Sequence, residues 1–110
     1  MTTSLHPIIR TFLDAHLTDD HQTALRTFSP TAVVTDQGET FRGTDDVGRF
    51  LREAGSEYTY TTEERGAEQV DDAHWVVAIH LEGNFPGGVA DLHYRFTLDG
   101  TVISRVVIEP

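Results

Sequence analysis

The first half of the chain carries apolar residues at the spacing of amphipathic α-helices. These positions are Leu5, Ile8, Ile9, Phe12, Leu13, His16 and Leu17, then Ala24, Leu25 and Phe28, and later Val47, Phe50, Leu51 and Ala54. Residues that typically begin a helix precede each set, namely Thr3 or Ser4, Asp19 and Asp20, and Thr44. Ser29-Pro30 ends the second segment and Gly55 the third, so we predict three helices.

The other segments are rich in β-branched and aromatic residues and are separated by turn residues. We predict strands at residues 31–36, 57–69, 74–82, 89–98 and 102–108, with a loop through Gly38 and Gly43 after the first of them. The chain is therefore expected to form one α+β domain spanning residues 1–110. In that domain, three N-terminal helices pack on a curved antiparallel β-sheet and enclose an apolar pocket.

Alternation along the predicted strands indicates which side chains face the helices. The inward set is Trp75, Val77, Ile79, Leu81, Leu92, Tyr94 and Phe96. The outward set combines His80, His93 and Arg95 with the apolar residues Val76, Ala78, Val102, Val106 and Ile108. Because apolar side chains on an outer sheet face favour a partner sheet, we predict a homodimer through this face.

Charge and composition narrow the functional classes. The net charge of −10 over 110 residues disfavours nucleic-acid binding. All eight basic residues other than histidine are arginines and there is no cysteine, which excludes lysine Schiff-base and thiolate chemistry. The sequence shows neither a signal peptide nor an apolar run long enough to span a membrane, so we expect a cytoplasmic protein without membrane partners.

Three stretches carry a resemblance to a known superfamily. They are residues 28–36 (FSPTAVVTD), residues 41–50 (FRGTDDVGRF) and residues 93–96 (HYRF) before the Asp99-Gly100 turn. Together with the order of elements, they resemble the nuclear-transport-factor-2-like superfamily, in its SnoaL-like and ketosteroid-isomerase-like branch. This resemblance implies a cone-shaped fold around a pocket, often a dimer through the outer sheet face, and functions that range from isomerases and cyclases to binding domains.

The resemblance also implies particular site residues. Asp36 stands where ketosteroid isomerases have their general-base aspartate. Phe12 stands where they have a tyrosine that donates a hydrogen bond to the oxyanion, and Leu92 stands where they have a second donor, a protonated aspartic acid. The base is thus present and both donors are replaced by apolar residues.

Asp36 is the main candidate for chemistry. A carboxylate at the mouth of an apolar pocket loses solvation and its pKa rises, which suits a general acid or base near neutral pH. The alternative is a strand-end aspartate that caps the turn at Gly38.

His16 follows Phe12 by one helical turn and could give a ligand a proton or hydrogen bond, or could be a satisfied semi-buried histidine. Arg105, if it points inward, pairs with Asp36 or an anionic ligand, and otherwise lies on the surface.

Aromatic residues are expected to line the pocket. Tyr58, Tyr60 and Tyr94 could replace the missing oxyanion donors, or could simply be core aromatics. The full predicted lining is Phe12, His16, Phe50, Tyr58, Tyr60, Trp75, Val77, Ile79, Leu92, Tyr94 and Arg105. His74, His80 and His93 are interpreted as outer-face histidines and not as metal ligands, because no carboxylate shell accompanies them.

Two functions fit these residues. The first is a small-molecule pocket protein that acts as a cofactor-independent isomerase- or cyclase-type enzyme, with Asp36 as general acid/base on a small apolar carbonyl compound. The second is a non-catalytic domain that binds a hydrophobic ligand or serves in dimerisation. Asp36 favours the first, whereas Phe12 and Leu92 favour the second.

Overall fold

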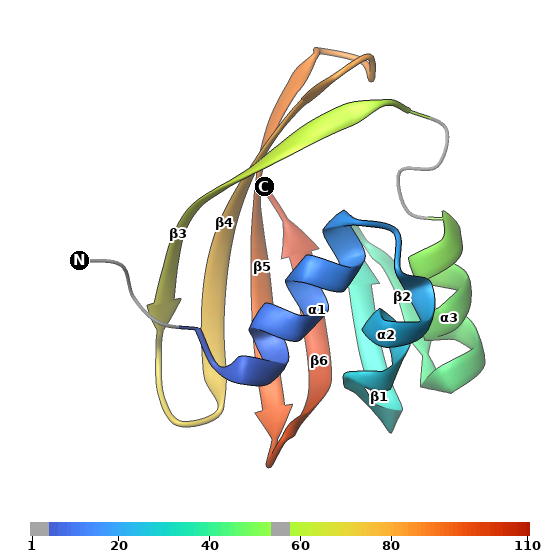
Figure 1. Cartoon of the computed structure of the whole chain (residues 1–110), viewed down its shortest axis with the longest axis vertical. Coiled ribbons are helices and arrows are strands. Elements are labelled where there is room, and N and C mark those ends of the chain that lie inside the picture. Colours follow the sequence, from blue (N-terminus) through green and yellow to red (C-terminus); the bar gives the residue numbers. More distant parts are fainter. Residues whose placement is uncertain (1–4, 54–57) are drawn as a thin grey trace.

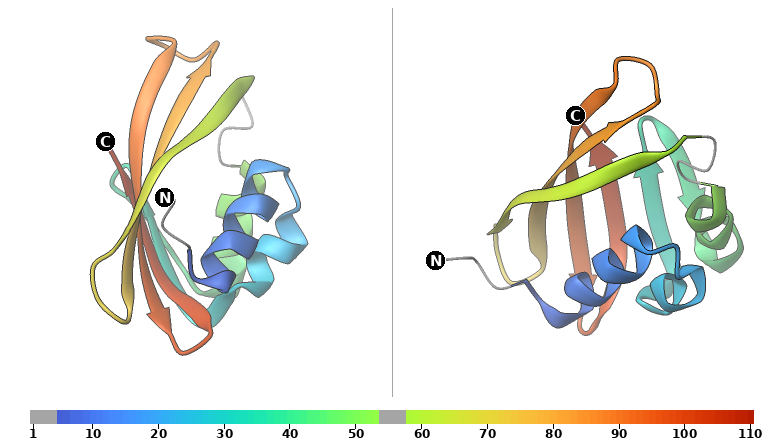
Figure 2. Two further views of the ribbon diagram at one scale, coloured as in Figure 1. Left: turned by 60° about the vertical axis from the view of Figure 1, so that its left-hand side comes forward. Right: turned by 45° about the horizontal axis from the view of Figure 1, so that its top comes forward.

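Helices and strands form two layers in the computed structural model of the chain, which describes residues 5–53 and 58–110 (Figure 1). These residues contain three helices, α1 (Pro7–Leu17), α2 (His21–Arg26) and α3 (Gly43–Glu53). They also contain six strands, β1 (Phe28–Asp36), β2 (Glu39–Arg42), β3 (Tyr60–Gln69), β4 (His74–Gly83), β5 (Val89–Asp99) and β6 (Val102–Glu109). The strands form one open, curved sheet in the order β2-β1-β6-β5-β4-β3, and the helices lie on its concave face (Figure 2). The predicted α+β class is confirmed.

The sheet is mixed, which corrects the prediction of a purely antiparallel sheet. Strands β1 and β6 run parallel, while the other neighbouring pairs run antiparallel. A parallel pair needs a long crossover, and the whole chain between β1 and β6 supplies it. This crossover contains α3, so only α1 and α2 precede the first strand.

Strand β2 lies where the sequence pattern predicts a loop, between Gly38 and Gly43. It pairs with β1 through a tight turn at Gln37 and Gly38, whose φ angles are 50° and 88°. Four residues between two glycine-containing turns show too little alternation to indicate a strand from sequence. The start of the strand predicted at residue 57 lies outside the described residues.

Residues next to the helix N-termini explain where the helices begin. The His6 ring accepts a hydrogen bond from the Ile8 backbone N–H at 3.2 Å and caps α1, and Asp20 accepts one from the Thr23 N–H at 3.2 Å and caps α2. Helix α3 begins at Gly43, which has a φ of 80°. Three predicted helix-end residues lie outside the described residues, namely Thr3, Ser4 and Gly55.

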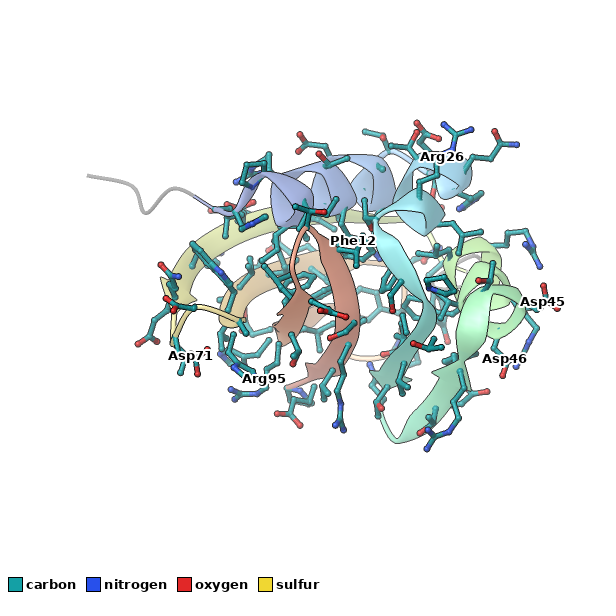
Figure 3. All side chains as sticks on the ribbon, turned by 90° about the horizontal axis from the view of Figure 1, so that it is seen from below. Phe12, Arg26, Asp45, Asp46, Asp71 and Arg95 are labelled. Atoms are coloured by element: carbon teal, nitrogen blue, oxygen red, sulfur yellow. The ribbon has the colours of Figure 1, made fainter. Side chains whose placement is uncertain are left out.

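The core lies between α1 and the inner face of the central strands. Phe12 is fully buried, and the centroid of its ring lies 5.4 Å from that of Phe28 and 5.7 Å from that of Phe96, both in edge-on contact. Figure 3 shows Phe12 between the helix layer and the sheet, with Arg95 on the opposite face of the sheet. Phe12 thus joins the two layers of the fold.

A β-bulge reverses the expected orientation of side chains in β6. Leu98 pairs with Ile103, whereas Thr97 pairs with Arg105, so Ser104 is the extra residue. After the bulge, Val106 and Ile108 are buried in the core, although alternation predicted them on the outer face. Arg105 is exposed, which corresponds to the surface alternative, and it is not available as a ligand-binding residue of the pocket.

Candidate functional site

The helices and the sheet leave an open cavity of about 750 Å³ at the end of the molecule where α1 stops and β1 ends. Seven predicted site residues line it, namely His16, Asp36, Phe50, Tyr58, Tyr60, Leu92 and Tyr94. The remaining lining residues were not selected from sequence and are Gln37, Glu39, Glu53, Leu81, Phe85, Pro86, Val89, Ala90 and Ile108.

The other predicted site residues lie elsewhere. Four of them, Phe12, Trp75, Val77 and Ile79, are buried in the hydrophobic core and do not line this cavity. Trp75, Val77 and Ile79 face inward from β4 as predicted, and Phe12 faces the sheet from α1, but all four lie in the core between the two layers. Arg105 lies on the other face of the sheet and cannot pair with Asp36 across the cavity.

Asp36 reaches the cavity because it is the last residue of β1 and shares the inward face with Ala32 and Val34. Its carboxylate is half-buried and makes no hydrogen bond or ion pair with another described residue. Burial, and next the negative charge of Glu39, raise its pKa. An unpaired carboxylate with a raised pKa is the arrangement that a general base near neutral pH requires.

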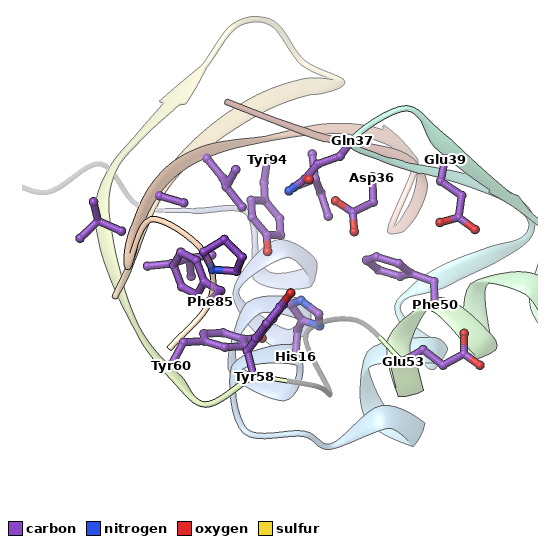
Figure 4. Close-up of a pocket in the computed structure, with 16 residues that line it drawn as sticks. His16, Asp36, Gln37, Glu39, Phe50, Glu53, Tyr58, Tyr60, Phe85 and Tyr94 are labelled. Carbon is purple, nitrogen blue, oxygen red and sulfur yellow. The ribbon is translucent and has the colours of Figure 1, made fainter. Parts of the chain in front are cut away.

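Tyr94 faces the same space. Its side chain is 6% exposed, and its hydroxyl points into the cavity without a hydrogen bond to any other described residue (Figure 4). Burial, and next the charge of Asp36, raise the pKa of the phenol. The hydroxyl therefore keeps its proton at neutral pH and is free to donate a hydrogen bond to a ligand.

His16 closes the inner end of the cavity. Its ring stacks on Phe12 with centroids 5.2 Å apart, and Phe50 and Tyr94 follow at 6.1 and 6.2 Å. Burial lowers the pKa of His16 to about 4, so the imidazole is neutral at pH 7. His16 can exchange hydrogen bonds with a ligand but carries no charge to it.

Acidification is expected to destabilise the protein through His16. The unfolded chain protonates this histidine near pH 6.5 and the folded protein near pH 4, so stability falls as the pH drops between these values. We expect the wild type to lose about 2 kcal/mol more unfolding free energy than His16→Gln between pH 7 and 4.5.

Urea denaturation of both proteins at the two pH values measures this difference. His74→Gln, which changes an exposed histidine, is the matched control. Equal losses in the wild type and His16→Gln would show that the His16 ring is solvated.

The mouth of the cavity has an aromatic side and an acidic side. Tyr58 and Phe85 make an edge-on contact with centroids 6.1 Å apart, and Tyr60 lies beside them (Figure 4). Glu39 and Glu53 lie on the opposite side, beyond Phe50 (Figure 4). The sequence pattern did not indicate Glu39, Glu53 or Phe85, because each lies next to a turn or a helix end where alternation stops.

The described residues contain no cluster of three or more histidine, aspartate or glutamate side chains positioned to hold a metal ion. Two outer histidines instead pair with carboxylates. Nδ1 of His74 lies 2.7 Å from Asp71, and His80 lies between Asp91, 2.6 Å from its Nδ1, and Glu82, 3.5 Å from its Nε2. None of the described helices is long and apolar enough to cross a membrane.

Comparisons with known proteins identify the superfamily. No protein-family profile matches the chain, and no curated protein matches it significantly. A candidate polyketide cyclase from Sinorhizobium meliloti is 30% identical, with 96% of this chain and 95% of that chain covered and a TM-score of 0.87. The chain therefore belongs to the nuclear-transport-factor-2-like superfamily, in its SnoaL-like and ketosteroid-isomerase-like branch.

Two more distant structures share the fold and contain ligands. A ketosteroid-isomerase-like protein from Catenulispora acidiphila in complex with trimethylamine is 11% identical, with 97% of this chain and 87% of that chain covered and a TM-score of 0.83. A Mycobacterium tuberculosis protein in complex with estradiol-17β-hemisuccinate is 12% identical, with 94% and 90% covered and a TM-score of 0.75. The fold and the cavity together define a pocket protein of the SnoaL and ketosteroid-isomerase type.

Proposed function

We propose that this protein binds a small, largely apolar carbonyl compound and catalyses a proton transfer on it without a cofactor. The observation that carries the proposal is that Asp36 and Tyr94 line the same cavity. Asp36 supplies an unpaired, partly desolvated carboxylate, and Tyr94 supplies a protonated hydroxyl with no other described partner. The carbonyl compound would lie between them.

In this mechanism Asp36 removes a proton from the carbon next to the carbonyl group. The electron pair of that C–H bond moves to form an enolate, and the Tyr94 hydroxyl donates a hydrogen bond to its oxygen. The protonated Asp36 then returns the proton to another carbon, which completes an isomerisation. In a cyclisation, the enolate carbon instead attacks a second carbonyl carbon, the electron pair of that C=O π bond moves to its oxygen, and the resulting alkoxide takes the proton from Asp36. Tyr94 thereby takes the role of the oxyanion donors in the ketosteroid-isomerase pattern, whose positions are occupied in this chain by Phe12 and Leu92.

The shape of the cavity supports a small ligand. We infer a cone-shaped cavity that narrows from Tyr58, Tyr60 and Val89 at the mouth to His16 and Tyr94 inside. A volume of about 750 Å³ is in the range of ordinary small-molecule sites. The candidate polyketide cyclase and the estradiol-hemisuccinate complex among the structural neighbours agree with ligands of this kind.

A titration of Asp36 tests the chemical premise. We expect NMR to give this carboxyl group a pKa above the value of about 3.9 for a free aspartate. Glu39→Gln should lower the Asp36 pKa, because it removes a neighbouring negative charge. Arg105→Leu is the control and should leave it unchanged, because Arg105 lies on the other face of the sheet. An ordinary pKa in all three proteins would end the proposal that Asp36 is the base.

The alternative function is non-catalytic binding of a hydrophobic ligand. Phe12 and Leu92 favour it, because both replace oxyanion donors of the ketosteroid-isomerase pattern. In that case Asp36 would be only a polar contact in the cavity. The substitution of Asp36 discussed below separates the two functions.

We also propose that the protein forms a homodimer through the outer face of the sheet. Val76 and Ala78 on β4 and Val107 on β6 are half-buried there, and they flank His93 and Arg95 on β5. Covering this apolar surface with a second copy would remove it from water. Light scattering at micromolar concentration should give about twice the monomer mass of 12.3 kDa. Val107→Asp should shift the mass to that of the monomer, and a monomeric wild type would contradict the proposal.

A further inference from the structure

The cavity carries charge of one sign. Asp36, Glu39 and Glu53 line it, and none of the eight arginines of the chain does so. The one lining histidine, His16, is neutral at pH 7 because burial lowers its pKa to about 4. Glu53 also lies 3.9 Å from the guanidinium of Arg49, which does not line the cavity. Among the described residues, Asp36 and Glu39 therefore line the cavity without an ion-pair partner, and no lining side chain carries a positive charge.

The apolar surface of the cavity is arranged opposite this charge. Tyr58, Tyr60 and Phe85 form one wall, and Asp36, Glu39 and Glu53 lie toward the other (Figure 4). We call these the aromatic wall and the acidic wall. The unpartnered hydroxyl of Tyr94, on a side chain that is 6% exposed, points into the space between them and is a ready hydrogen-bond donor.

We propose that the natural ligand of this cavity is an organic cation, with an apolar body on the aromatic wall and an ammonium head at the acidic wall. This inference rests on the proposed function, namely that the cavity binds a small molecule, and it names the chemical class of that molecule. For the proton-transfer reaction, it makes the substrate an amine-bearing carbonyl compound. The ammonium group would lie near Glu39 and Glu53, and the carbonyl oxygen near Tyr94.

Electrostatics favours a cation over its neutral or anionic counterparts. Like charges repel within the acidic wall, because the charge of Glu39 raises the pKa of Asp36. A positive group placed among these carboxylates relieves the repulsion. The attraction is strongest near Asp36, which is half-buried, and weaker near the exposed Glu39 and Glu53. Phe50, the aromatic residue on the same side of the cavity as Glu39 and Glu53, adds a further attraction for an ammonium group (Figure 4). The carboxylates would repel an anion, and neither an arginine nor a charged histidine lines the cavity to offset that repulsion.

Three probes of equal shape and different charge test the inference. They are 4-hydroxyphenyltrimethylammonium, its neutral isostere 4-tert-butylphenol, and the anion 4-hydroxybenzenesulfonate. Affinities are measured at low salt by NMR titration, with the resonances of His16, Phe50 and Tyr94 as reporters. The cation should bind at least ~10-fold more tightly than the neutral isostere, and the anion should bind most weakly.

Matched variants locate the origin of this preference. The double substitution Glu39→Gln with Glu53→Gln should reduce the ratio of cation to neutral affinity by at least ~3-fold and leave 4-tert-butylphenol binding unchanged. The control is Glu68→Gln with Asp99→Asn, which removes two exposed carboxylates outside the cavity lining and should preserve the ratio. Unchanged binding of the neutral probe also shows that each variant is folded with an intact cavity.

The outcomes separate this inference from the function on which it rests. Equal binding of cation and neutral isostere, or tightest binding of the anion, would overturn the cationic ligand while leaving a small-molecule cavity in place. A ratio that the double substitution does not change would also overturn it. If none of the probes shifts the reporter resonances, the cavity does not bind small molecules of this size, and the proposed function fails as well.

Discussion

Asp36→Asn is expected to lower catalysed proton transfer by at least ~10²-fold while ligand affinity stays similar or improves. The amide keeps the shape of the carboxylate but cannot accept the proton. It also costs less to bury than a charged carboxylate, so binding does not suffer from the exchange. The measurement is deuterium exchange from D₂O at the carbon next to the carbonyl of phenylacetone, followed by NMR with and without the protein.

The matched control is Asp72→Asn, which changes an exposed turn residue outside the cavity lining and should keep full activity. Equal exchange rates for the wild type and Asp36→Asn would remove Asp36 from the mechanism. A wild type that binds 4-tert-butylphenol but does not accelerate exchange would instead support the non-catalytic alternative. Tyr94→Phe should retain binding and lose part of the rate, because it removes only the hydrogen bond to the enolate oxygen.

Phe12→Ala should lower the unfolding free energy by about 3–5 kcal/mol, a large share of the roughly 5–15 kcal/mol that stabilises a domain of this kind. Phe12 is fully buried, and the rings of His16, Phe28 and Phe96 surround it at centroid distances of 5.2, 5.4 and 5.7 Å. Removing the ring leaves a cavity between the two layers that its neighbours cannot fill. Urea denaturation monitored by circular dichroism gives the loss.

Val89→Ala is the control for this substitution, because Val89 lines the mouth of the cavity and is 57% exposed. We expect it to change the unfolding free energy by less than about 0.5 kcal/mol. A loss below about 1 kcal/mol for Phe12→Ala would mean that Phe12 lines an open cavity, as the sequence pattern predicted. The two substitutions together therefore decide whether this ring belongs to the core or to the site.

The inward faces of β4 and β5 could be predicted because their alternation is regular. Trp75, Val77, Ile79, Leu92 and Tyr94 are all buried, as expected. The same alternation does not say how far along a strand the core gives way to the cavity. Leu92 and Tyr94 line the cavity, whereas Trp75, Val77 and Ile79 do not. The boundary between core and cavity depends on where α1 crosses the sheet. That position follows from how the helices and the sheet pack together, and the alternation within one strand does not contain it.

Features that depend on pairing could not be predicted from one sequence. The bulge at Ser104 changes the face of Arg105 without any glycine or proline to signal it. The acidic wall was missed for a related reason, because Glu39 and Glu53 come from a short edge strand and the end of α3. Only the fold places these two segments beside Asp36 around one cavity. Asp36 itself was identifiable because its place after the first strand is part of the superfamily pattern.

The parallel pairing of β1 with β6 has a consequence for how the chain folds as it leaves the ribosome. The hairpins β3–β4 and β4–β5 join neighbouring segments and close short loops, so they can form early. Strands β1 and β2 can pair with each other through their tight turn, but β1 attaches to the rest of the sheet only through residues 102–109. Asp36 therefore reaches its final position only after residues 102–109 have been synthesised. Docking of β1 is then the slow, non-local event of folding, and the cavity is the last part of the molecule to form.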